Sequence, residues 1–266
     1  MELTVSPEPA LRIERRAKLL SVTFARPAER NTLTRQTLNE LSRAFDEAER
    51  DPHCRIVLLE GSGGFFCSGM DFGEMNSRAG DAQASAAATH GDIHYMDLLR
   101  RIATTGQIVI SAVDGQVLAG GIGIVAASDL VLATPASRFS LPEALWGLLP
   151  ACVLPLLIRR IGFQNAYRMT LTTETMTAGQ SLEAGLVDEL ADSLDDAIRR
   201  RSLRLTRLDP ETVRRMKAYF QKMWYLSDAT YQTAVNEIET LVRDPRIQEN
   251  IRNFVEHKRF PWEKMG

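Results

Sequence analysis

The feature that most constrains this chain is a glycine-rich segment, "GQVLAGGIGIVAASD" (residues 115–129), which directly follows the strand-like run "IVISAV". An apolar run that ends in a glycine turn and continues into small apolar residues predicts a buried strand leading into a helix. Within the segment Gly121, Gly123 and Ala126 spell G-x-G-x-x-A, and an acid, Glu143, follows about twenty residues later. The outline matches the dinucleotide-binding fingerprint, so a nicotinamide cofactor is the first hypothesis to test.

The position of the acid argues against that hypothesis. The fingerprint normally opens a β-α-β unit whose second strand ends in the acid. Here the next strand-like run, "DLVLAT", ends near Thr134, and Glu143 stands nine residues later, after Pro142. A lone G-x-G-x-x-A is a weak signal, so nicotinamide binding is the less favoured interpretation of these glycines.

A second interpretation needs only the backbone of the same segment. Gly120 and Gly121 stand where the strand turns into the helix, and the first N–H groups of a helix lack internal partners and favour negative charge. Glycine lets a ligand atom approach such a donor, and an enolate oxygen is one anion that pre-aimed donors stabilise. A second donor could come from "FFCSGMDF" (65–72), the glycine-rich turn after the strand "RIVLLEG" (55–61). From spacing alone, both stretches could equally be tight turns with no ligand.

Composition and charge narrow the class of protein. The 266 residues are 44% hydrophobic and 25% charged, with a formal net charge of −2. These values suit one large domain, or a domain with a smaller appendage, and argue against disorder and nucleic-acid binding. The N-terminus is polar and acidic rather than a signal peptide, and no apolar run reaches the roughly 18 residues of a membrane span. One predicted helix is rich in arginine, and its positive face is either simply solvated or a docking site for a partner. These residues are Arg199, Arg200, Arg201, Arg204 and Arg207.

The cysteines and histidines show neither a disulfide framework nor a metal pattern. Cys54, Cys67 and Cys152 are odd in number and scattered, which fits a reducing cytosol and predicts a cytoplasmic protein. His90 and His94 are one helical turn apart, but no third ligand is apparent and no H-E-x-x-H motif occurs. We therefore expect no bound metal.

Hydrophobic periodicity predicts alternating strands and helices up to about residue 195. Strands are expected at 19–27, 55–61, 107–115 and 129–134, and helices at 32–51, 93–105, within 138–150 and from 153 onward. Thr32 is the expected cap of the first helix. The small and polar residues 76–92 are expected to form a mobile loop, a candidate lid.

Beyond about residue 195 the strand signals stop. The chain therefore divides into an α/β core, residues 1–195, and a helical C-terminal part, residues 196–266. Apolar residues at helical spacing define its expected faces: Val213, Met216, Phe220 and Met223 on one; Tyr231, Ala234, Ile238 and Leu241 on another; Ile251, Phe254 and Val255 on a third.

Several of these segments together resemble the crotonase (enoyl-CoA hydratase/isomerase) superfamily. The matching motifs are "ARPAERNTLT", "GSGGFFCSGMDF", "AVDGQVLAGGIGIVAASDLVLAT", "RFSLPEALWGLLP" and "MTAGQSLEAGLVDEL". They occur in the order typical of the family over roughly residues 10–195. The resemblance implies a crotonase-like ββα spiral core and C-terminal helices that form a homotrimer or a dimer of trimers. It also implies a thioester substrate on coenzyme A or a 4′-phosphopantetheine arm, with no other cofactor.

The resemblance also assigns site residues. It implies that backbone N–H groups of Met70 and Gly120 hold the thioester oxygen, and that Glu143 in "FSLPE" moves the α proton. The residue pattern alone would also allow Glu143 to be an exposed acid at a helix start after proline. Hydratases of the family carry a second glutamate where this chain has Gly123, so activation of water between two acids is not expected. The residues implied to contact the carrier arm are Arg26, Ala28, Ser68, Gly69 and Asp71.

A closer likeness lies within the superfamily. The segment "FSLPEALWGLLPACVLPLLIRRIGFQNAYRMTLTTE" and the terminal "FPWE" resemble the first hydratase-like enzyme of polyketide β-branching, which dehydrates 3-hydroxy-3-methylglutaryl-carrier protein to the 3-methylglutaconyl form. This implies an acyl carrier protein as partner, which Arg159, Arg160 and the 199–207 arginines are candidates to dock. Glu143, Tyr95 and His94 are candidates to protonate the leaving hydroxide. The alternatives are an isomerase, hydratase or decarboxylase of the superfamily, and a non-enzymatic scaffold.

Overall fold

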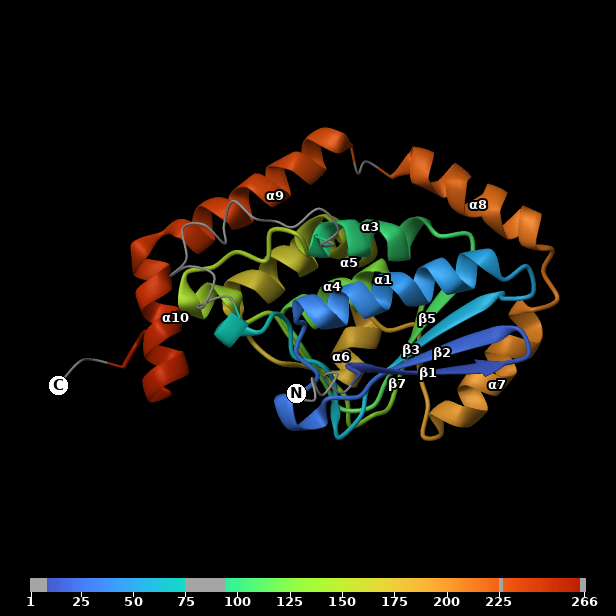
Figure 1. Ribbon diagram of the computed structural model, residues 1–266, viewed down its shortest axis with the longest axis horizontal. Coiled ribbons are helices and arrows are strands. Elements are labelled where there is room, and N and C mark those ends of the chain that lie inside the picture. Colours follow the sequence, from blue (N-terminus) through green and yellow to red (C-terminus); the bar gives the residue numbers. More distant parts are fainter. Residues whose placement is uncertain (1–8, 75–93, 225–226, 264–266) are drawn as a thin grey trace, which may run out of the picture.

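The computed structural model describes residues 9–74, 94–224 and 227–263, and its described strands form two sheets (Figure 1). The main sheet has the order β1 (Leu11–Arg16), β2 (Leu19–Phe24), β3 (Ile56–Glu60), β5 (Ile108–Val113), β7 (Leu130–Ala133) and β10 (Glu189–Leu190). The second has the order β4 (Phe65–Cys67), β6 (Gln116–Leu118), β8 (Arg138–Ser140) and β9 (Met176–Thr177).

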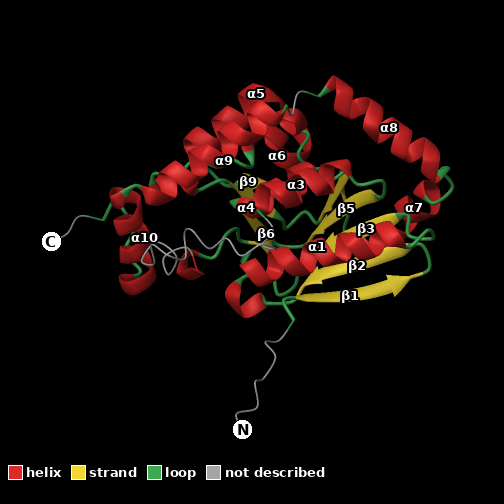
Figure 2. Cartoon of the chain, turned by 45° about the horizontal axis from the view of Figure 1, so that its top comes forward, coloured by secondary structure: helices red, strands yellow, loops and turns green. Residues whose placement is uncertain are grey.

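Helices surround the main sheet on both faces (Figure 2). They are α1 (Arg35–Arg50), α3 (Tyr95–Thr104), α4 (Gly120–Ala127), α5 (Leu154–Thr172), α6 (Ala178–Glu183), α7 (Leu194–Leu205), α8 (Pro210–Met223), α9 (Asp228–Arg243) and α10 (Pro245–His257). Two 3₁₀ turns, η1 (Pro27–Glu29) and η2 (Glu143–Trp146), complete the described elements. Helix α5 is broken at Gly162, whose φ of 76° and ψ of 163° are not helical.

A repeated unit generates the architecture. From β3 to α5, each turn of the chain lays one strand in the main sheet, the next in the second sheet, and then helical residues, as in β5, β6 and α4. The pairs β3·β5, β5·β7, β4·β6 and β6·β8 are all parallel, so successive units stack in one direction. The expected crotonase-like ββα spiral is thereby confirmed.

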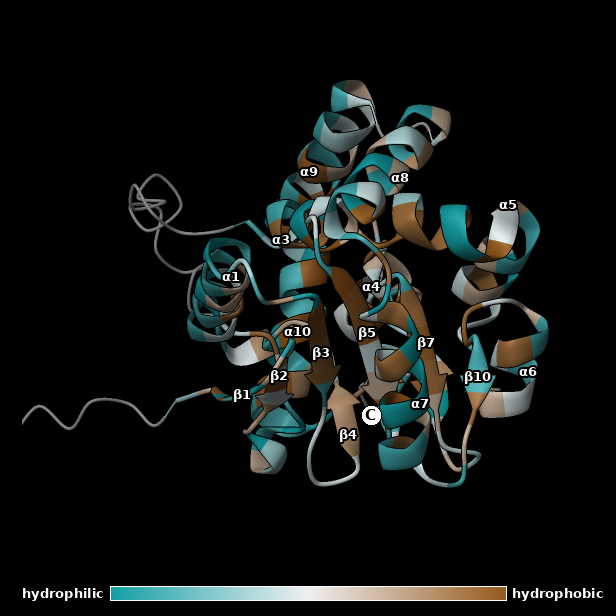
Figure 3. Ribbon diagram, turned by 90° about the vertical axis from the view of Figure 1, so that its right-hand side faces the viewer, coloured by the Kyte–Doolittle hydropathy of each residue, from teal (hydrophilic) through white to brown (hydrophobic). Residues whose placement is uncertain are grey.

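The central strands are buried on both faces, as their continuous apolar runs predict (Figure 3). Along β3, Val57 and Leu59 belong to the main core under α1, α3, α4 and α5. The alternate residues Ile56 and Leu58 face a second core, to which α7 contributes Ala197 and Ile198. This alternation fixes the register of the sheet, because a slip of one residue would exchange the two faces.

The first helix starts later than the sequence analysis expected. Its cap is Thr34, whose side chain accepts a hydrogen bond from the Thr37 N–H, rather than Thr32. The hydroxyl of Thr32 instead donates to Asp71 at 3.1 Å, in the loop that follows β4. Thr32 therefore links the loop before α1 to the loop after β4, which carries Met70. A sequence pattern for helix capping does not reveal such a contact between distant segments.

The C-terminal helices follow the expected helical pattern but bury less than expected. The last described strand ends at Leu190, and α8 and α9 arch over the helical layer toward α10 (Figure 1). On the α8 face that the sequence predicted, only Val213 is buried, while Met216, Phe220 and Met223 are exposed. These three side chains therefore face solvent in a single copy of the chain.

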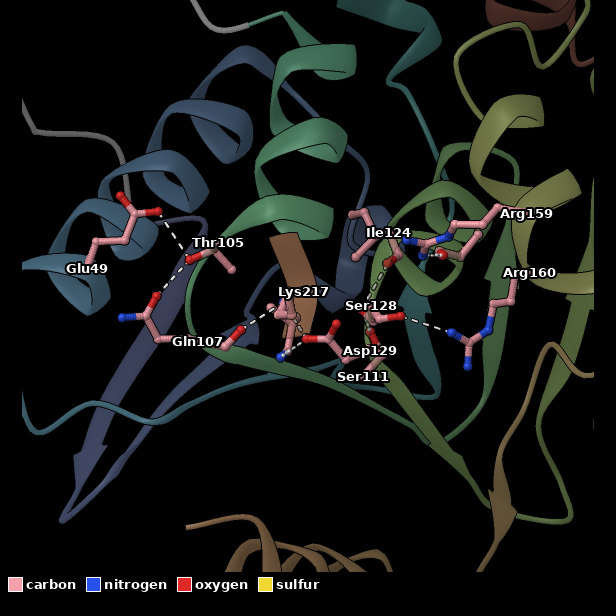
Figure 4. A network of polar contacts seen from close by, with 12 residues as sticks. Glu49, Thr105, Gln107, Ser111, Ile124, Ser128, Asp129, Arg159, Arg160 and Lys217 are labelled. Carbon is pink, nitrogen blue, oxygen red and sulfur yellow. Dashed lines mark hydrogen bonds and ion pairs between the residues drawn. The ribbon is translucent and has the colours of Figure 1, made fainter. Parts of the chain in front are cut away.

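A buried ion pair anchors α8 to the sheet (Figure 4). The ammonium of Lys217 lies 2.6 Å from Asp129 Oδ2 and donates to the Gln107 carbonyl at 2.9 Å. Asp129 also accepts from the Val109 N–H at 2.8 Å, so its carboxylate joins α8 to β5. Burial lowers the pKa of Lys217, although the pairing with Asp129 opposes that shift. A buried cation needs such partners, which makes this contact specific for one docking position of α8.

Two arginines proposed for partner docking are instead used inside the fold (Figure 4). Arg159 donates to the Ala126 carbonyl at 2.7 Å and stacks on the Trp224 ring at 4.5 Å. Arg160 donates to the Ser128 carbonyl at 2.9 Å and pairs with Asp188. Both cations therefore satisfy carbonyls at the C-terminal end of α4, and docking of a carrier protein by them stays a prediction.

The polar segment 76–92, with the expected lid, lies outside the described residues, as does His90. Among the residues that are described, we find no helix with the length and apolar character that crossing a membrane requires.

Candidate active site

The first turn of α4 sits deep in the protein at the end of a strained turn. All eight residues of α4 are buried, and Ala119, which precedes it, has φ 49° and ψ −123°. A non-glycine residue with positive φ is uncommon and costs of the order of 1–3 kcal/mol, so the surrounding contacts must enforce it. The N–H of Gly120 is the first of the helix and has no intrahelical acceptor.

The loop after β4 supplies the neighbouring backbone. Leu33 forms an isolated bridge with Met70, in which the Leu33 N–H donates to Gly69 and the Asp71 N–H donates to Leu33. In such a bridge the N–H of Met70 points away from Leu33. Gly69 has φ +86°, and a Cβ built on it would lie 2.9 Å from the Gly120 nitrogen. The two predicted donors, Met70 and Gly120, are thus carried by loops in direct contact.

The other glycines of the motif serve packing. A Cβ at Gly121 would overlap the carbonyl of Cys67, and one at Gly123 would overlap the hydroxyl of Tyr95. Backbone atoms therefore require glycine at position 121, and at position 123 a larger residue would have to displace the Tyr95 side chain. The G-x-G-x-x-A spacing is explained without a pyrophosphate, in agreement with the sequence argument against a nicotinamide cofactor.

Glu143 is the predicted acid of the site, and its charge acts on Tyr95, which packs against Gly120. Glu143 begins η2, directly after β8 and Pro142, and its Oε2 atom is buried without a hydrogen-bond partner among the described residues. Burial raises the pKa of its carboxyl group to about 7. The alternative interpretation, an exposed acid at a helix start, does not fit this environment. Near neutral pH such a group can both accept and return a proton.

Tyr95 and His94 are the two residues after segment 76–92 that were predicted to donate a proton to the leaving hydroxide. Only Tyr95 packs against Gly120 and Gly123. Its hydroxyl donates to the carbonyl of Gly120 and fills the space above Gly123. Burial raises the pKa of Tyr95 well above its usual value. His94 precedes α3 as its N-cap residue and is exposed. The structure therefore brings Tyr95, Gly120 and Gly123 together and leaves His94 at the surface.

The residues predicted to contact the carrier arm line the approach along two loops. Ala28 is exposed in η1, and Arg26, beside it, donates to Thr34 at 3.4 Å. Ser68 is half-buried next to Gly69. The carboxylate of Asp71 accepts from Thr32 and from the Glu74 N–H, so it organises the loop. Contact of these residues with a substrate stays a prediction.

Sequence reasoning missed Trp146, three residues after Glu143. Its side chain is 9% exposed and its Nε1 has no partner among the described residues. The spacing within "PEALWG" is the signal that could have found it, because residues i and i+3 lie on one side of a 3₁₀ turn. Within the described residues no cluster of histidine, cysteine, aspartate and glutamate could hold a metal ion.

Comparison with known proteins identifies the family of this fold and site. The enoyl-CoA hydratase/isomerase family matches residues 14–265. Bacillaene synthase dehydratase PksH of Bacillus subtilis is 34% identical over 255 residues, which cover 95% of this chain and 96% of that protein. Mevalonyl-coenzyme A hydratase SIDH of Beauveria bassiana is 30% identical over 262 residues, covering 92% and 91%. The chain belongs to the enoyl-CoA hydratase/isomerase family, and these homologues are named as enzymes that remove or add water.

The structural comparison agrees over nearly the whole chain. A crystal structure of B. subtilis pksH matches with a TM-score of 0.87 at 33% identity, covering 95% of this chain and 99% of that one. A crystal structure from Acinetobacter baumannii matches with a TM-score of 0.83 at 24% identity, which shows the shared fold. The likeness therefore includes the C-terminal helices as well as the spiral core.

The contact between the two donor loops leads to a first prediction. In Gly69→Ala the new Cβ would lie 2.7 Å from the Ala119 Cβ, so the loop must move away from α4. We expect a stability loss of about 1 kcal/mol or more and a fall in thioester turnover of about a hundredfold. Gly64→Ala is the matched control, because Gly64 has φ +80° but nothing within 4 Å of its Cβ position. It should lose similar stability and keep its turnover; equal loss of turnover in both variants would contradict the assignment.

The environment of Glu143 predicts a stability that depends on pH. Its folded-state pKa of about 7 lies above the ordinary value of 4.5, so between these values the folded state holds a proton that the unfolded state has lost. The free energy of unfolding should therefore fall as pH rises through this window, by up to about 3 kcal/mol. The contribution of Glu143 is measured by urea unfolding of the wild type and of Glu143→Gln at pH about 5 and about 8. The difference between the two proteins in how their free energy of unfolding changes with pH is that contribution. Identical pH slopes in both proteins would show that Glu143 is not desolvated.

Proposed function

We propose that this protein is a hydro-lyase that removes water from a 3-hydroxy-3-methylglutaryl group carried on an acyl carrier protein, giving the 3-methylglutaconyl thioester. One observation carries the proposal: the buried, unpaired carboxylate of Glu143 has a pKa of about 7 and is the only acid of its motif, since Gly123 replaces the second. A single group of this kind can serve an elimination in which one proton is taken and one is returned.

The first step is removal of the C2 proton. Glu143 accepts that proton, and the electron pair of the C–H bond moves toward the thioester carbonyl to form an enolate. The N–H groups of Met70 and Gly120 donate to the enolate oxygen, and the dipole of α4 adds to their effect. Donors fixed in a buried site need no reorganisation as charge develops, so they lower the barrier more than water does.

In the second step the C3–O bond breaks. The enolate electrons form the C2–C3 double bond, and the departing hydroxide takes a proton, so that one water leaves and Glu143 is again a carboxylate. Glu143 itself is the best donor, because its pKa of about 7 suits proton transfer in both directions. The hydroxyl of Tyr95 is held by the Gly120 carbonyl and its pKa is well above the ordinary value. We therefore assign Tyr95 to positioning α4, and His94 has no role in the transfer.

The names of the relatives support this choice of substrate. The B. subtilis relative is a dehydratase of bacillaene synthase, a polyketide assembly, and covers almost all of this chain. The fungal relative is named for mevalonyl-coenzyme A, and a mevalonyl group is itself a 3-hydroxy-3-methylacyl group. The first name fits removal of water from a polyketide intermediate, and the second fits a substrate with a tertiary 3-hydroxyl.

The carrier arm supplies the thioester, and the arginines 199–207 remain candidates to dock a carrier protein, although Arg200 and Arg201 already pair with Glu189.

The runner-up is an enoyl-CoA isomerase that acts on a CoA thioester. Moving a double bond also needs one base that takes a proton at one carbon and returns it at another, and Glu143 meets that requirement. Both functions place the protein in a reducing compartment, which fits its three buried free thiols, Cys54, Cys67 and Cys152.

Mass spectrometry of the intact carrier protein tests the proposed reaction. Carrier protein loaded with the 3-hydroxy-3-methylglutaryl group should lose the mass of one water when this protein is added. Glu143→Gln should abolish that loss while preserving the fold, because it keeps the shape of the side chain and removes the base. The same acyl group on CoA shows whether the carrier is required. Conversion of a 3-enoyl-CoA without any water loss from the hydroxyacyl substrates would favour the isomerase and overturn the dehydratase.

An apolar stripe on α5 supports self-association as a further part of the proposal. Phe163, Tyr167 and Leu171 are spaced by four residues on one face and are 66%, 52% and 66% exposed. Exposed apolar faces of this kind mark interaction surfaces. We propose that the stripe contacts another copy of the chain in a homotrimer or a dimer of trimers, together with the C-terminal helices.

Charge placed in the stripe should therefore dissociate the assembly. Sedimentation velocity of Phe163→Glu/Leu171→Glu should show a lower mass than the wild type, because a carboxylate cannot be buried unpaired at an interface. Leu203→Glu, at a residue 58% exposed on α7, is the matched control and should leave the mass unchanged. An unchanged mass in the double variant would remove α5 from the interface.

A further inference from the structure

Trp146 is a buried hydrogen-bond donor without an acceptor. It ends η2, its side chain is 9% exposed, and its Nε1 has no partner among the described residues. A buried indole N–H usually finds a partner, because leaving such a group unpaired costs about 1–3 kcal/mol. Nothing in the steps assigned to Glu143, Met70 and Gly120 uses this donor, so a substrate group is a candidate acceptor.

The donor lies on the same side of η2 as the acid. Residues i and i+3 lie on one side of a 3₁₀ helix, so the geometry of η2 puts Trp146 on the same side as Glu143. The Oε2 atom of Glu143 is likewise buried without a partner, and the two groups are not bonded to each other. A buried acceptor and a buried donor, both unpaired and on one face of one turn, suit two polar ends of a single ligand.

Three aromatic rings pack around the indole of Trp146 and hold it in place. The Trp146 ring lies 5.5 Å from Phe72, 5.7 Å from Phe254 and 6.2 Å from Phe260 between centroids. Phe254 belongs to α10 and Phe260 follows it, so the C-terminal segment closes over η2. At the rim, Lys258 Nζ lies 5.7 Å over the Phe254 ring. The side chains around the indole are thus mainly aromatic, the Asn250 side chain donates to the Trp146 carbonyl, and Lys258 adds a positive charge beside Phe254.

We propose that the indole N–H of Trp146 binds the distal carboxylate of the acyl group, a subsite that rests on the proposed function. In the acyl group three carbon–carbon bonds separate C2, on which Glu143 acts, from the carboxylate carbon, so the acid and the donor would act on two ends of one short chain. A carboxylate entering mainly aromatic surroundings requires a hydrogen-bond donor, and Lys258 adds a favourable charge. The subsite selects acyl groups that end in an acid and aligns C2 with Glu143.

Two substrates, one with and one without the distal carboxylate, distinguish carboxylate binding by Trp146 from a purely structural role. The wild type and Trp146→Phe are compared on carrier protein loaded with a 3-hydroxy-3-methylglutaryl or a 3-hydroxy-3-methylbutyryl group, which lacks the distal carboxylate. Phenylalanine keeps an aromatic ring and removes the N–H. We expect kcat/KM of the variant to fall about tenfold to a hundredfold for the first substrate and little for the second. Equal loss on both substrates would overturn the proposal and assign Trp146 to packing or to the shared 3-hydroxyl.

Phe72→Leu is the matched control in the same cluster. It disturbs the aromatic packing of Trp146 but keeps the N–H, so it should affect both substrates alike. If the wild type releases no water from either substrate, the proposed function fails and the subsite is tested by binding. Calorimetry then compares Glu143→Gln with Glu143→Gln/Trp146→Phe on the CoA thioesters of the two acyl groups. A selective weakening for the 3-hydroxy-3-methylglutaryl thioester supports the subsite, and weakening of neither or of both alike overturns it.

Discussion

The site depends on one close approach of backbone to backbone, between the loop after β4 and the first turn of α4. The Cys67 carbonyl lies where a Cβ of Gly121 would be, and a Cβ on Gly69 would lie 2.9 Å from the Gly120 nitrogen. Only glycine permits this distance. Met70 and Gly120 belong to successive units of the spiral, and this contact makes their N–H groups neighbours. The parallel pairing of β4 with β6 places the two loops at the same edge, so the spiral and the donor pair are one feature.

The short helix α4 is held at both ends, which keeps its first N–H groups in place. At the N-terminal end the Tyr95 hydroxyl donates to the Gly120 carbonyl. At the other end Arg159 and Arg160 donate to the carbonyls of Ala126 and Ser128. Cations near the C-terminus of a helix also complement its dipole. A helix fixed in this way presents donors that do not need to reorganise when a negative charge forms nearby, and that is the condition for effective electrostatic catalysis.

Strand periodicity and glycine turns are local signals, and they predicted alternating strands and helices in the first 195 residues. The spiral and the role of Glu143 came from the resemblance of several motifs, in order, to the family. The sequence did not predict contacts between segments far apart in the chain. Arg159 and Arg160 were expected at the surface as docking residues, since nothing in a helical run of sequence shows that carbonyls of α4 lie beneath it. The burial that raises the pKa of Glu143, and the missing partner of Trp146, likewise depend on elements that close over η2 from elsewhere in the chain.

The packing of Tyr95 over Gly123 occupies the position of a second acid, which agrees with the proposal of a single acid. A side chain at position 123 would overlap the Tyr95 hydroxyl and lie 3.1 Å from Leu99 and 3.2 Å from Val153. The position at which family hydratases carry a second glutamate is therefore filled by a phenol that is bound to the backbone. A site with two acids can hold one protonated and one ionised at the same moment, whereas the proposed reaction uses one group in both states in succession. Burial makes that feasible by bringing the pKa of Glu143 to about 7, where neither state is strongly favoured at neutral pH.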